Sequence, residues 1–221
     1  MRSWCRVISV VVIAIVAVLA WTSAATAQTE SKLTASDAAA QDTFGKSVSI
    51  DGDYAILGAS GNNDGESAYI FSRSGTTWTQ QVKLAADDST ADDQFGESVS
   101  ISGNYAIVGA ELDDDNGVDS GSAYIFFRTG TTWTQQVKLT ASDATEGDQF
   151  GSSVSISGDY AIVGADLFGD NIGGSIGSAY IFFRTGTTWT QQDILQASDA
   201  GIDDQFGHSV SISGDYAIVG A

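Results

Sequence analysis

One segment of the sequence carries four acidic residues at a spacing that could hold a cation. Counted from the first, they stand at positions 1, 3, 5 and 9, and they are Glu111, Asp113, Asp115 and Asp119. EF-hand-like calcium loops place oxygen ligands at these positions and make a sharp turn at position 6, where Asn116 stands. Ser122 occupies position 12, where such loops carry a bidentate acid. The spacing makes this segment the best candidate for a calcium site in the sequence, and the interpretation we favour over it is a solvated acidic loop.

The corresponding loops of other repeats carry fewer polar residues. Four of these residues, together with Asp114 of the 111–119 segment, are predicted to lie on a ligand-binding face. The five residues are Asn62, Asp64, Asp114, Asp166 and Asp170. Catalysis is not expected. His208 is the only histidine, and no Ser/His/Asp set can be built around it from the sequence. The chain is therefore predicted not to be an enzyme.

Four internal repeats determine where these residues stand. Phe-Gly recurs with periods of 51, 55 and 56 residues, and Gly-Ala follows each copy at a constant distance. The motif residues, which we expect to be structural, are Phe44, Gly45, Gly58, Ala59, Phe95, Gly96, Gly109, Ala110, Phe150, Gly151, Gly164, Ala165, Phe206, Gly207, Gly220 and Ala221. All variation in length falls between Gly-Ala and the next Ser-Ala-Tyr. One variable loop on a constant scaffold is free to carry function.

Each repeat predicts four short β-strands. Segments such as 54–57 and 68–71 are apolar on both faces, as in strands covered on both sides, and a Gly-containing link fits a tight hairpin. The predicted fold is all-β. It is a β-propeller segment of four-stranded antiparallel blades, with three complete blades plus half of a fourth in an incomplete ring. The blades are expected at about 44–84, 95–139, 150–195 and 206–221, within a repeat domain of residues 28–221.

The paired Phe-Gly and Gly-Ala motifs, with SAYIF between them, resemble the FG-GAP repeat family. This family comprises the propeller repeats of integrin alpha chains and of many secreted bacterial proteins, and the bacterial type is the closer likeness. The resemblance implies an extracellular adhesion or interaction module, in some members with bound calcium. It also implies that the loops between strands 2 and 3 and between blades form the ligand face. Ser60, Glu111 and Asp166 replace the proline of GAP, and the family's calcium loop between strands 1 and 2 has no matching residues.

Repeated residues have simpler interpretations. We expect Trp78, Trp133 and Trp189 to pack between blades, since they share one position on strand 4. Acids that recur two and seven residues before Phe are predicted to bond to turn backbone. These acids are Asp42, Asp93, Asp148 and Asp204, and Asp37, Asp88, Asp143 and Asp199.

Charge and the N-terminal segment limit the location and the partners. The chain has 28 acidic and 9 basic side chains and a net charge of −19, which argues against nucleic acid or an anionic membrane surface as partner. Residues 1–27 are predicted to be a signal peptide, because two arginines precede an apolar run and an Ala-Thr-Ala cleavage site ends at Ala27. We therefore expect a secreted or cell-surface protein.

The predicted function is a non-catalytic interaction or adhesion module that binds an extracellular protein or a glycan through the acidic loop face. The alternatives are a structural calcium-binding propeller or spacer, and an accessory domain of a larger extracellular enzyme. The last repeat stops inside a blade, as in a truncated reading frame or a fragment of a larger ring. The sequence thus predicts self-association through an open blade edge at residues 216–219.

Overall fold

The computed structural model describes residues 30–61, 66–90, 92–167 and 176–221. The chain divides into two units, Met1–Lys32 and Leu33–Ala221, and every strand belongs to the second. The predicted signal peptide, as well as Asn62, Asp64 and Asp170, lies outside the described residues. Within those residues, no helix has the length and apolar character needed to cross a membrane.

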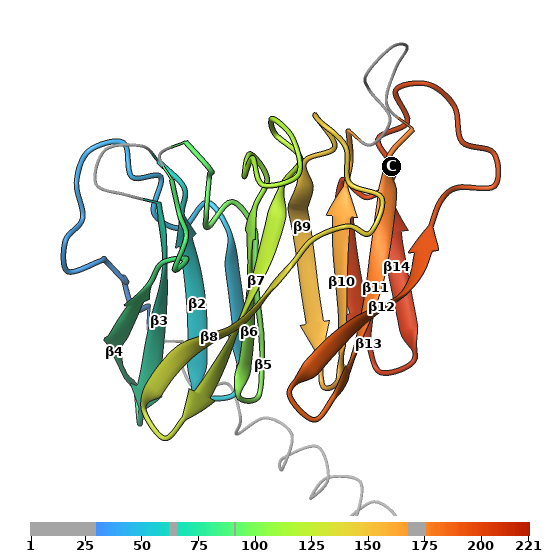
Figure 1. The fold of residues 1–221 in the computed structure, drawn as a ribbon. Helices are drawn as coiled ribbons and strands as arrows, with labels where there is room; N and C mark the ends of the chain where they lie inside the picture. The colour runs from blue at the N-terminus through green and yellow to red at the C-terminus, as the bar shows by residue number, and fades with distance from the viewer. Residues whose placement is uncertain (1–29, 62–65, 91, 168–175) are drawn as a thin grey trace, which may run out of the picture. The chain divides into compact units, whose positions relative to one another are not determined.

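The described strands form four antiparallel sheets in chain order (Figure 1). Sheet 1 contains β1 (Val48–Asp51), β2 (Tyr54–Ala59), β3 (Ser67–Ser74) and β4 (Thr77–Leu84). Sheet 2 contains β5 (Val99–Ser102), β6 (Tyr105–Ala110), β7 (Ser122–Thr129) and β8 (Thr132–Leu139). Sheet 3 contains β9 (Phe150–Ser157), β10 (Tyr160–Ala165), β11 (Ser178–Thr185) and β12 (Thr188–Leu195). Sheet 4 has only β13 (Ser209–Ser213) and β14 (Tyr216–Gly220). The predicted fold class is confirmed, and the ring of sheets is not closed.

Each sheet is a simple meander whose turns use glycine where a left-handed backbone is required. Gly52 in the β1–β2 turn has φ of 57°, and Gly75 in the β3–β4 turn has φ of 61°. Their counterparts in the later sheets have similar positive values. Glycine adopts this conformation without a steric cost, so the repeated Gly in each turn keeps the strands in register.

The sheets pack face to face, which explains why their strands are apolar on both sides. We call the face that a sheet turns to the next sheet its front face, and the face that it turns to the preceding one its rear face. Ile56 and Ile70 on the front face of sheet 1 share a buried cluster with Val99, Ile101 and Phe95 of sheet 2. A corresponding cluster joins sheets 2 and 3, and a smaller one joins sheets 3 and 4.

The Phe-Gly and Gly-Ala motifs meet at these contacts between sheets. A Cβ added to Gly109 would lie 2.0 Å from the carbonyl oxygen of Gly151 in the next sheet. Gly58 and Gly164 show the same approach to Gly96 and Gly207. The repeated glycines therefore allow neighbouring backbones to come closer than any side chain would permit.

The tryptophans pack between sheets, as expected. Trp133 and Trp189 are buried, and they lie edge-on to the tyrosines Tyr54 and Tyr105 of the preceding sheets, with ring centroids 6.4 and 6.0 Å apart. Trp78 occupies the same position in sheet 1 but is only partly buried. Its different exposure reflects its place on a rear face that no preceding sheet covers in the described chain.

Candidate functional site

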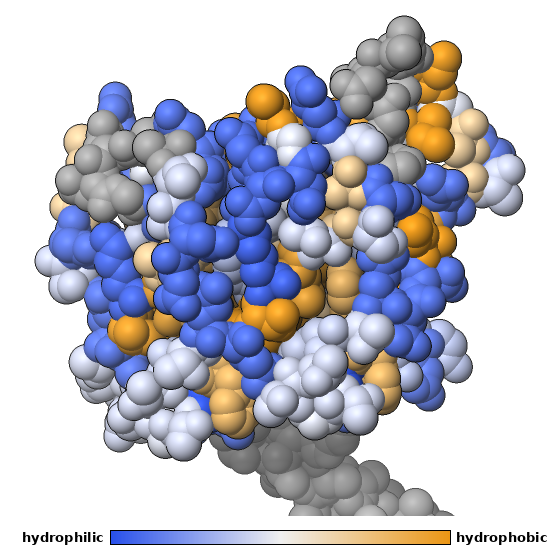
Figure 2. All heavy atoms as spheres, in the orientation of Figure 1, coloured by the Kyte–Doolittle hydropathy of each residue, from blue (hydrophilic) through white to orange (hydrophobic). Residues whose placement is uncertain are grey.

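The loops between strands 2 and 3 and the connectors between sheets emerge at one end of the sheets, which we call the loop end (Figure 1). The short β1–β2 and β3–β4 turns lie at the other end. Hydrophilic residues cover much of the loop end in the view of Figure 2. Its exposed carboxylates include Asp87, Asp114, Asp143, Glu146, Asp199 and Asp203. Their common location produces a negatively charged surface, which attracts positively charged partners.

The acids two residues before Phe bond to turn backbone, as predicted. Asp93 accepts hydrogen bonds from both the backbone N–H and the hydroxyl of Thr90, at 2.6 and 2.7 Å. Asp148 makes the same pair of contacts with Thr145. The acids seven residues before Phe behave differently in the first two repeats, where Asp37 and Asp88 pair with lysines of strand 4, at 2.7 and 3.0 Å. These two acids therefore form ion pairs, which the prediction of bonding to turn backbone did not include.

The loop that carries the predicted calcium ligands joins β6 to β7 and is held by its own hydrogen bonds. The N–H of Asp115 donates to the Asp113 carboxylate, and the N–H of Asp119 donates to Asp114. The backbone N–H of Gly121 donates to the carbonyl oxygen of Asp113 at 2.9 Å. These contacts fold the loop over Asp113, a residue that is only 3% exposed.

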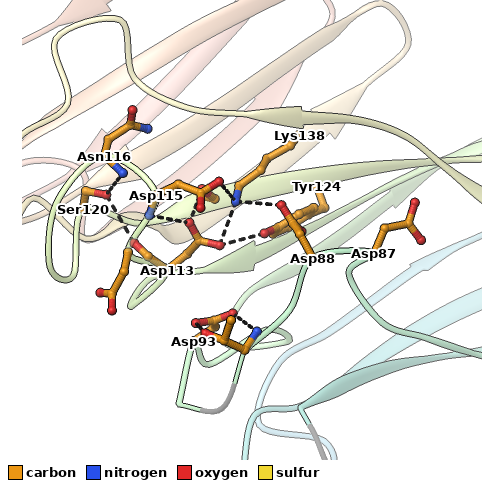
Figure 3. Close-up of polar contacts among 12 residues, drawn as sticks. Asp87, Asp88, Asp93, Asp113, Asp115, Asn116, Ser120, Tyr124 and Lys138 are labelled. Carbon is orange, nitrogen blue, oxygen red and sulfur yellow. Dashed lines mark hydrogen bonds and ion pairs between the residues drawn. The ribbon is translucent and has the colours of Figure 1, made fainter.

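Lys138 of β8 supplies the positive charge at the centre of this loop (Figure 3). Its ammonium group contacts Asp113 at 2.9 Å and Asp88 at 3.0 Å, and it also binds Asp115. Besides the N–H of Asp115, the hydroxyl groups of Tyr124 and Ser122 donate to Asp113, at 2.8 and 3.0 Å. Every oxygen of the buried carboxylate therefore has a partner.

The hydrogen bonds of this cluster favour the protonated forms of Lys138 and Tyr124. Burial alone would lower the pKa of Lys138, but hydrogen bonds to Asp115, Asp113 and Asp88 outweigh this effect and raise the pKa above its usual value. Burial and the hydrogen bond to Asp113 raise the pKa of Tyr124. Both groups consequently keep their protons at neutral pH and donate to the carboxylates.

This arrangement differs from the calcium cage that the spacing predicts. Asp113 and Asp115 both form ion pairs with Lys138. Glu111 has a separate set of charged neighbours, which are Glu97, Asp166, Lys46 and His208. Over the part of the chain that the structure describes, no group of three or more acidic, histidine or cysteine side chains could hold a metal ion. The loop spacing could not reveal this outcome, because the lysine comes from a neighbouring strand.

Glu111 belongs instead to a row of polar and charged residues at the loop end of successive sheets. The row consists of the residue after each Phe-Gly motif and the residue after each Gly-Ala motif. Lys46 pairs with Glu97 at 2.5 Å, Ser60 donates to Glu97 at 2.9 Å, and His208 contacts Asp166 at 3.0 Å. Burial raises the pKa of Glu111 to about 7, and the neighbouring Glu97 and Asp166 carboxylates add to the shift.

Glu111→Gln is expected to change how stability depends on pH. The folded pKa of about 7 exceeds the unfolded value of 4.5, so this group contributes stability that is present below about pH 4.5 and is lost as the pH rises through 7. Glutamine removes this loss, which should raise the free energy of unfolding at pH 8 by about 1–2 kcal/mol after allowance for residual solvent contact. Urea denaturation at pH 5 and pH 8 measures the change.

Glu146→Gln is the matched control for this prediction, because Glu146 is an exposed glutamate of the β8–β9 connector. Its substitution should leave the difference in stability between pH 5 and pH 8 unchanged. If Glu111→Gln behaves like this control, the side chain of Glu111 does not take up a proton near neutral pH.

His208 has a charged neighbour that the sequence did not reveal. Its ring contacts Asp166, and the histidine side chain is 70% exposed. Asp166 was predicted as a ligand-face residue, but it is buried beneath this contact. Asp114, by contrast, is exposed at the loop end, and its role as a ligand-face residue stays a prediction. The residue after Phe-Gly changes from repeat to repeat, and so does the residue after Gly-Ala, although the motifs themselves are constant. This variation at two fixed positions is the sequence signal that could have identified the row.

Comparison with known protein families agrees with the repeat architecture. The sequence profile of the FG-GAP repeat family matches residues 28–71, 78–126, 133–182 and 189–221. No curated protein sequence matches the chain. A solved structure of a mutant Aleuria aurantia lectin in complex with alpha-methyl-L-fucoside is similar over 75% of this chain, at 12% identity and a TM-score of 0.37. The matched part covers 47% of that lectin, so this chain spans about half its length.

The family match includes all four repeats and most of the sequence. Between them the matched segments reach into all four sheets, whose Phe-Gly and Gly-Ala motifs lie at the contacts between sheets. The chain therefore belongs to the FG-GAP repeat family.

Proposed function

We propose that this protein is a non-catalytic interaction module, secreted or held at the cell surface, that binds a protein or a glycan through its loop end. The observation that carries this proposal is the set of exposed carboxylates on the loops and connectors of successive sheets. Three lysines lie near these loops, but each already pairs with another acid and so offsets little of the charge on the exposed carboxylates. These lysines are Lys46, Lys83 and Lys138. The surface therefore presents an excess of negative charge to a partner.

The chemistry of this surface indicates which partners fit. A protein with a basic patch would gain electrostatic attraction and faster association, whereas nucleic acid and anionic lipid would be repelled. A neutral glycan would instead rely on hydrogen bonds to the carboxylates. Secretion is supported by the sequence of residues 1–27, and the absence of catalysis by the structural roles of the repeated acids.

A charge-matched pair of variants tests the proposed face. The face variant combines Asp114→Asn, Glu146→Gln and Asp203→Asn, which come from three separate loops or connectors of the loop end. The control variant combines Asp53→Asn, Asp193→Asn and Asp215→Asn, which removes the same charge from turns and a strand outside it. Labelled protein is applied to an array of glycans and to a panel of purified extracellular proteins.

We expect saturable binding that weakens with added salt, is reduced at least tenfold in the face variant and is unchanged in the control. Equal loss in both variants would indicate a non-specific effect of net charge. Binding by neither the parent chain nor the control at micromolar concentration would overturn the proposed function.

A further inference from the structure

The two ends of the stack of sheets expose apolar residues whose repeat equivalents are buried. Val48 and Ile50 on the rear face of sheet 1 are 65% and 66% exposed, whereas the equivalent Val99 and Ile101 are 7% and 5% exposed. On the front face of sheet 4, Tyr216 and Ile218 are 82% and 71% exposed. The described chain therefore displays one rear face and one front face without a neighbouring sheet.

The internal contacts show what such faces bind. Tyr54 lies on the front face of sheet 1, and the guanidinium of Arg128 stacks 4.0 Å from the centroid of its ring. Arg128 also donates a hydrogen bond of 2.7 Å to the tyrosine hydroxyl. Tyr105 lies in the same way under Arg184, at 4.3 Å. Each arginine in turn stacks on a tryptophan of its own sheet. An Arg–Trp pair on a rear face thus forms the receptor for a front-face tyrosine.

Both halves of this contact recur at the exposed ends. Arg73 stacks on Trp78 in sheet 1 at 5.7 Å, and no tyrosine of a preceding sheet covers the pair in the described chain. Tyr216 occupies in sheet 4 the position that Tyr54 and Tyr105 occupy in sheets 1 and 2. The tyrosine and its receptor are therefore present in one molecule but at opposite ends.

The backbone contacts are complementary as well. Ser47, Ser98 and Ser153 each donate a hydroxyl hydrogen bond to the Phe-Gly carbonyl oxygen of the next sheet, at 2.9, 2.7 and 2.6 Å. Ser209 is the next serine in this series, and Gly45 carries the equivalent carbonyl at the other end. Space beside both glycines is open, because a Cβ on Gly45 would meet nothing within 4 Å and one on Gly220 would meet only Ser209.

We infer that the front face of sheet 4 binds the rear face of sheet 1 of a second copy of this chain. The interface would continue the internal one: Tyr216 lies against Arg73 and Trp78 of the second copy, and Ile218 lies against its Val48 and Ile50. Gly220 then faces Gly45 of the second copy. Two different surfaces meet in this contact, so it is heterologous, and it either closes into a ring or extends as an open chain.

Closure is compatible with propeller geometry. The described residues of each chain form three four-stranded sheets and one two-stranded sheet, so two copies would contribute six complete blades and two half-blades, within the ~4–8 blades of known propellers. The second copy is the occupant that the structure favours, because the serine–carbonyl contact already occurs at three internal junctions and the Tyr–Arg–Trp contact at two of them. A binding partner at the loop end would leave these faces accessible.

Light scattering coupled to size-exclusion chromatography tests this inference with three single substitutions in the full chain. Ile50→Asp disables the rear face, Ile218→Asp disables the front face, and Ile202→Asp is the control. All three isoleucines are exposed in one molecule, at 66%, 71% and 67%, and Ile202 lies in the connector before β13, away from both faces. Circular dichroism and thermal melting verify that each variant folds.

We expect the parent chain and the Ile202→Asp variant to have at least twice the monomer mass at micromolar concentration, and each face variant alone to be monomeric. Mixing Ile50→Asp with Ile218→Asp should restore a dimer, because one intact front face and one intact rear face remain. A monomeric parent chain would overturn the inference. Dimerisation of either face variant alone would also overturn it, since that result indicates a symmetric contact between identical faces.

Discussion

Replacing Lys138 with methionine is expected to lower the free energy of unfolding by about 3–5 kcal/mol, as is typical when one partner of a buried ion pair is removed. The Lys138 side chain is 16% exposed and the Asp113 side chain 4%. Methionine retains an unbranched aliphatic stem of similar length, so packing is little changed. The loss instead comes from the Asp113 carboxylate, which keeps its hydroxyl donors but no longer has a compensating charge. Denaturation by urea, followed by circular dichroism, measures the change.

Lys83→Met is the matched control, because Lys83 is the repeat equivalent of Lys138 in sheet 1. Lys83 forms an ion pair with Asp37, whose side chain is 43% exposed, so solvent screens the interaction and the expected loss is about 1 kcal/mol or less. Adding Asp113→Asn to Lys138→Met should recover a substantial part of the loss by removing the buried charge. Similar losses in the two methionine variants would contradict the interpretation of Lys138 as the counter-ion of a buried carboxylate.

Gly109→Ala is expected to destabilise the fold by about 3 kcal/mol or more, at the upper end of the cost of overpacking a protein interior. The new methyl group would stand 2.0 Å from the carbonyl oxygen of Gly151 and 2.3 Å from the Ser98 hydroxyl. The hydroxyl can rotate away, but the carbonyl belongs to the backbone of the next sheet. Relief therefore requires sheets 2 and 3 to separate, which loosens their shared apolar cluster.

Gly220→Ala separates this effect from the ordinary cost of alanine in a strand. Gly220 is the same motif position in sheet 4, but the only close atom is the Ser209 hydroxyl, at 2.4 Å. We expect a change of about 1 kcal/mol or less when both variants are melted at a concentration low enough to keep the chain monomeric. Equal losses at Gly109 and Gly220 would mean that the contact between sheets is not the cause.

The sequence was sufficient to predict the fold because the repeats supply the same evidence several times. Phe95 and Phe150 are fully buried, and the sheets pair in the expected meander order. Turn glycines and strands apolar on both faces are local signals, so they are readable without knowledge of neighbouring sheets. The roles of Trp133 and Trp189 followed from their repeated position alone.

The site was less predictable because its contacts connect residues that are far apart in the chain. Lys138 is 25 residues from Asp113 and 50 from Asp88, and only the register of β7 and β8 and the packing of sheets 1 and 2 bring the three together. The same limitation applies to Glu111, whose neighbour Asp166 belongs to the next repeat. Spacing within one loop predicted ligands for calcium but could not show that an ammonium group from another strand would bind them.

The close glycine contacts between sheets also bear on how a chain of this kind changes in length. Each junction joins the same atoms of consecutive repeats, and the loops that vary lie outside it. Removing or duplicating one whole repeat would therefore re-create an existing junction rather than require a new one, whereas a partial repeat would not. The identical GTTWTQQ segments at 75–81, 130–136 and 186–192 provide in-register points for such exchanges. This architecture can therefore gain or lose whole repeats without a new kind of contact between sheets. The same holds for other repeat proteins, whose stability is approximately the sum of the stabilities of single repeats and of the interfaces between neighbouring repeats.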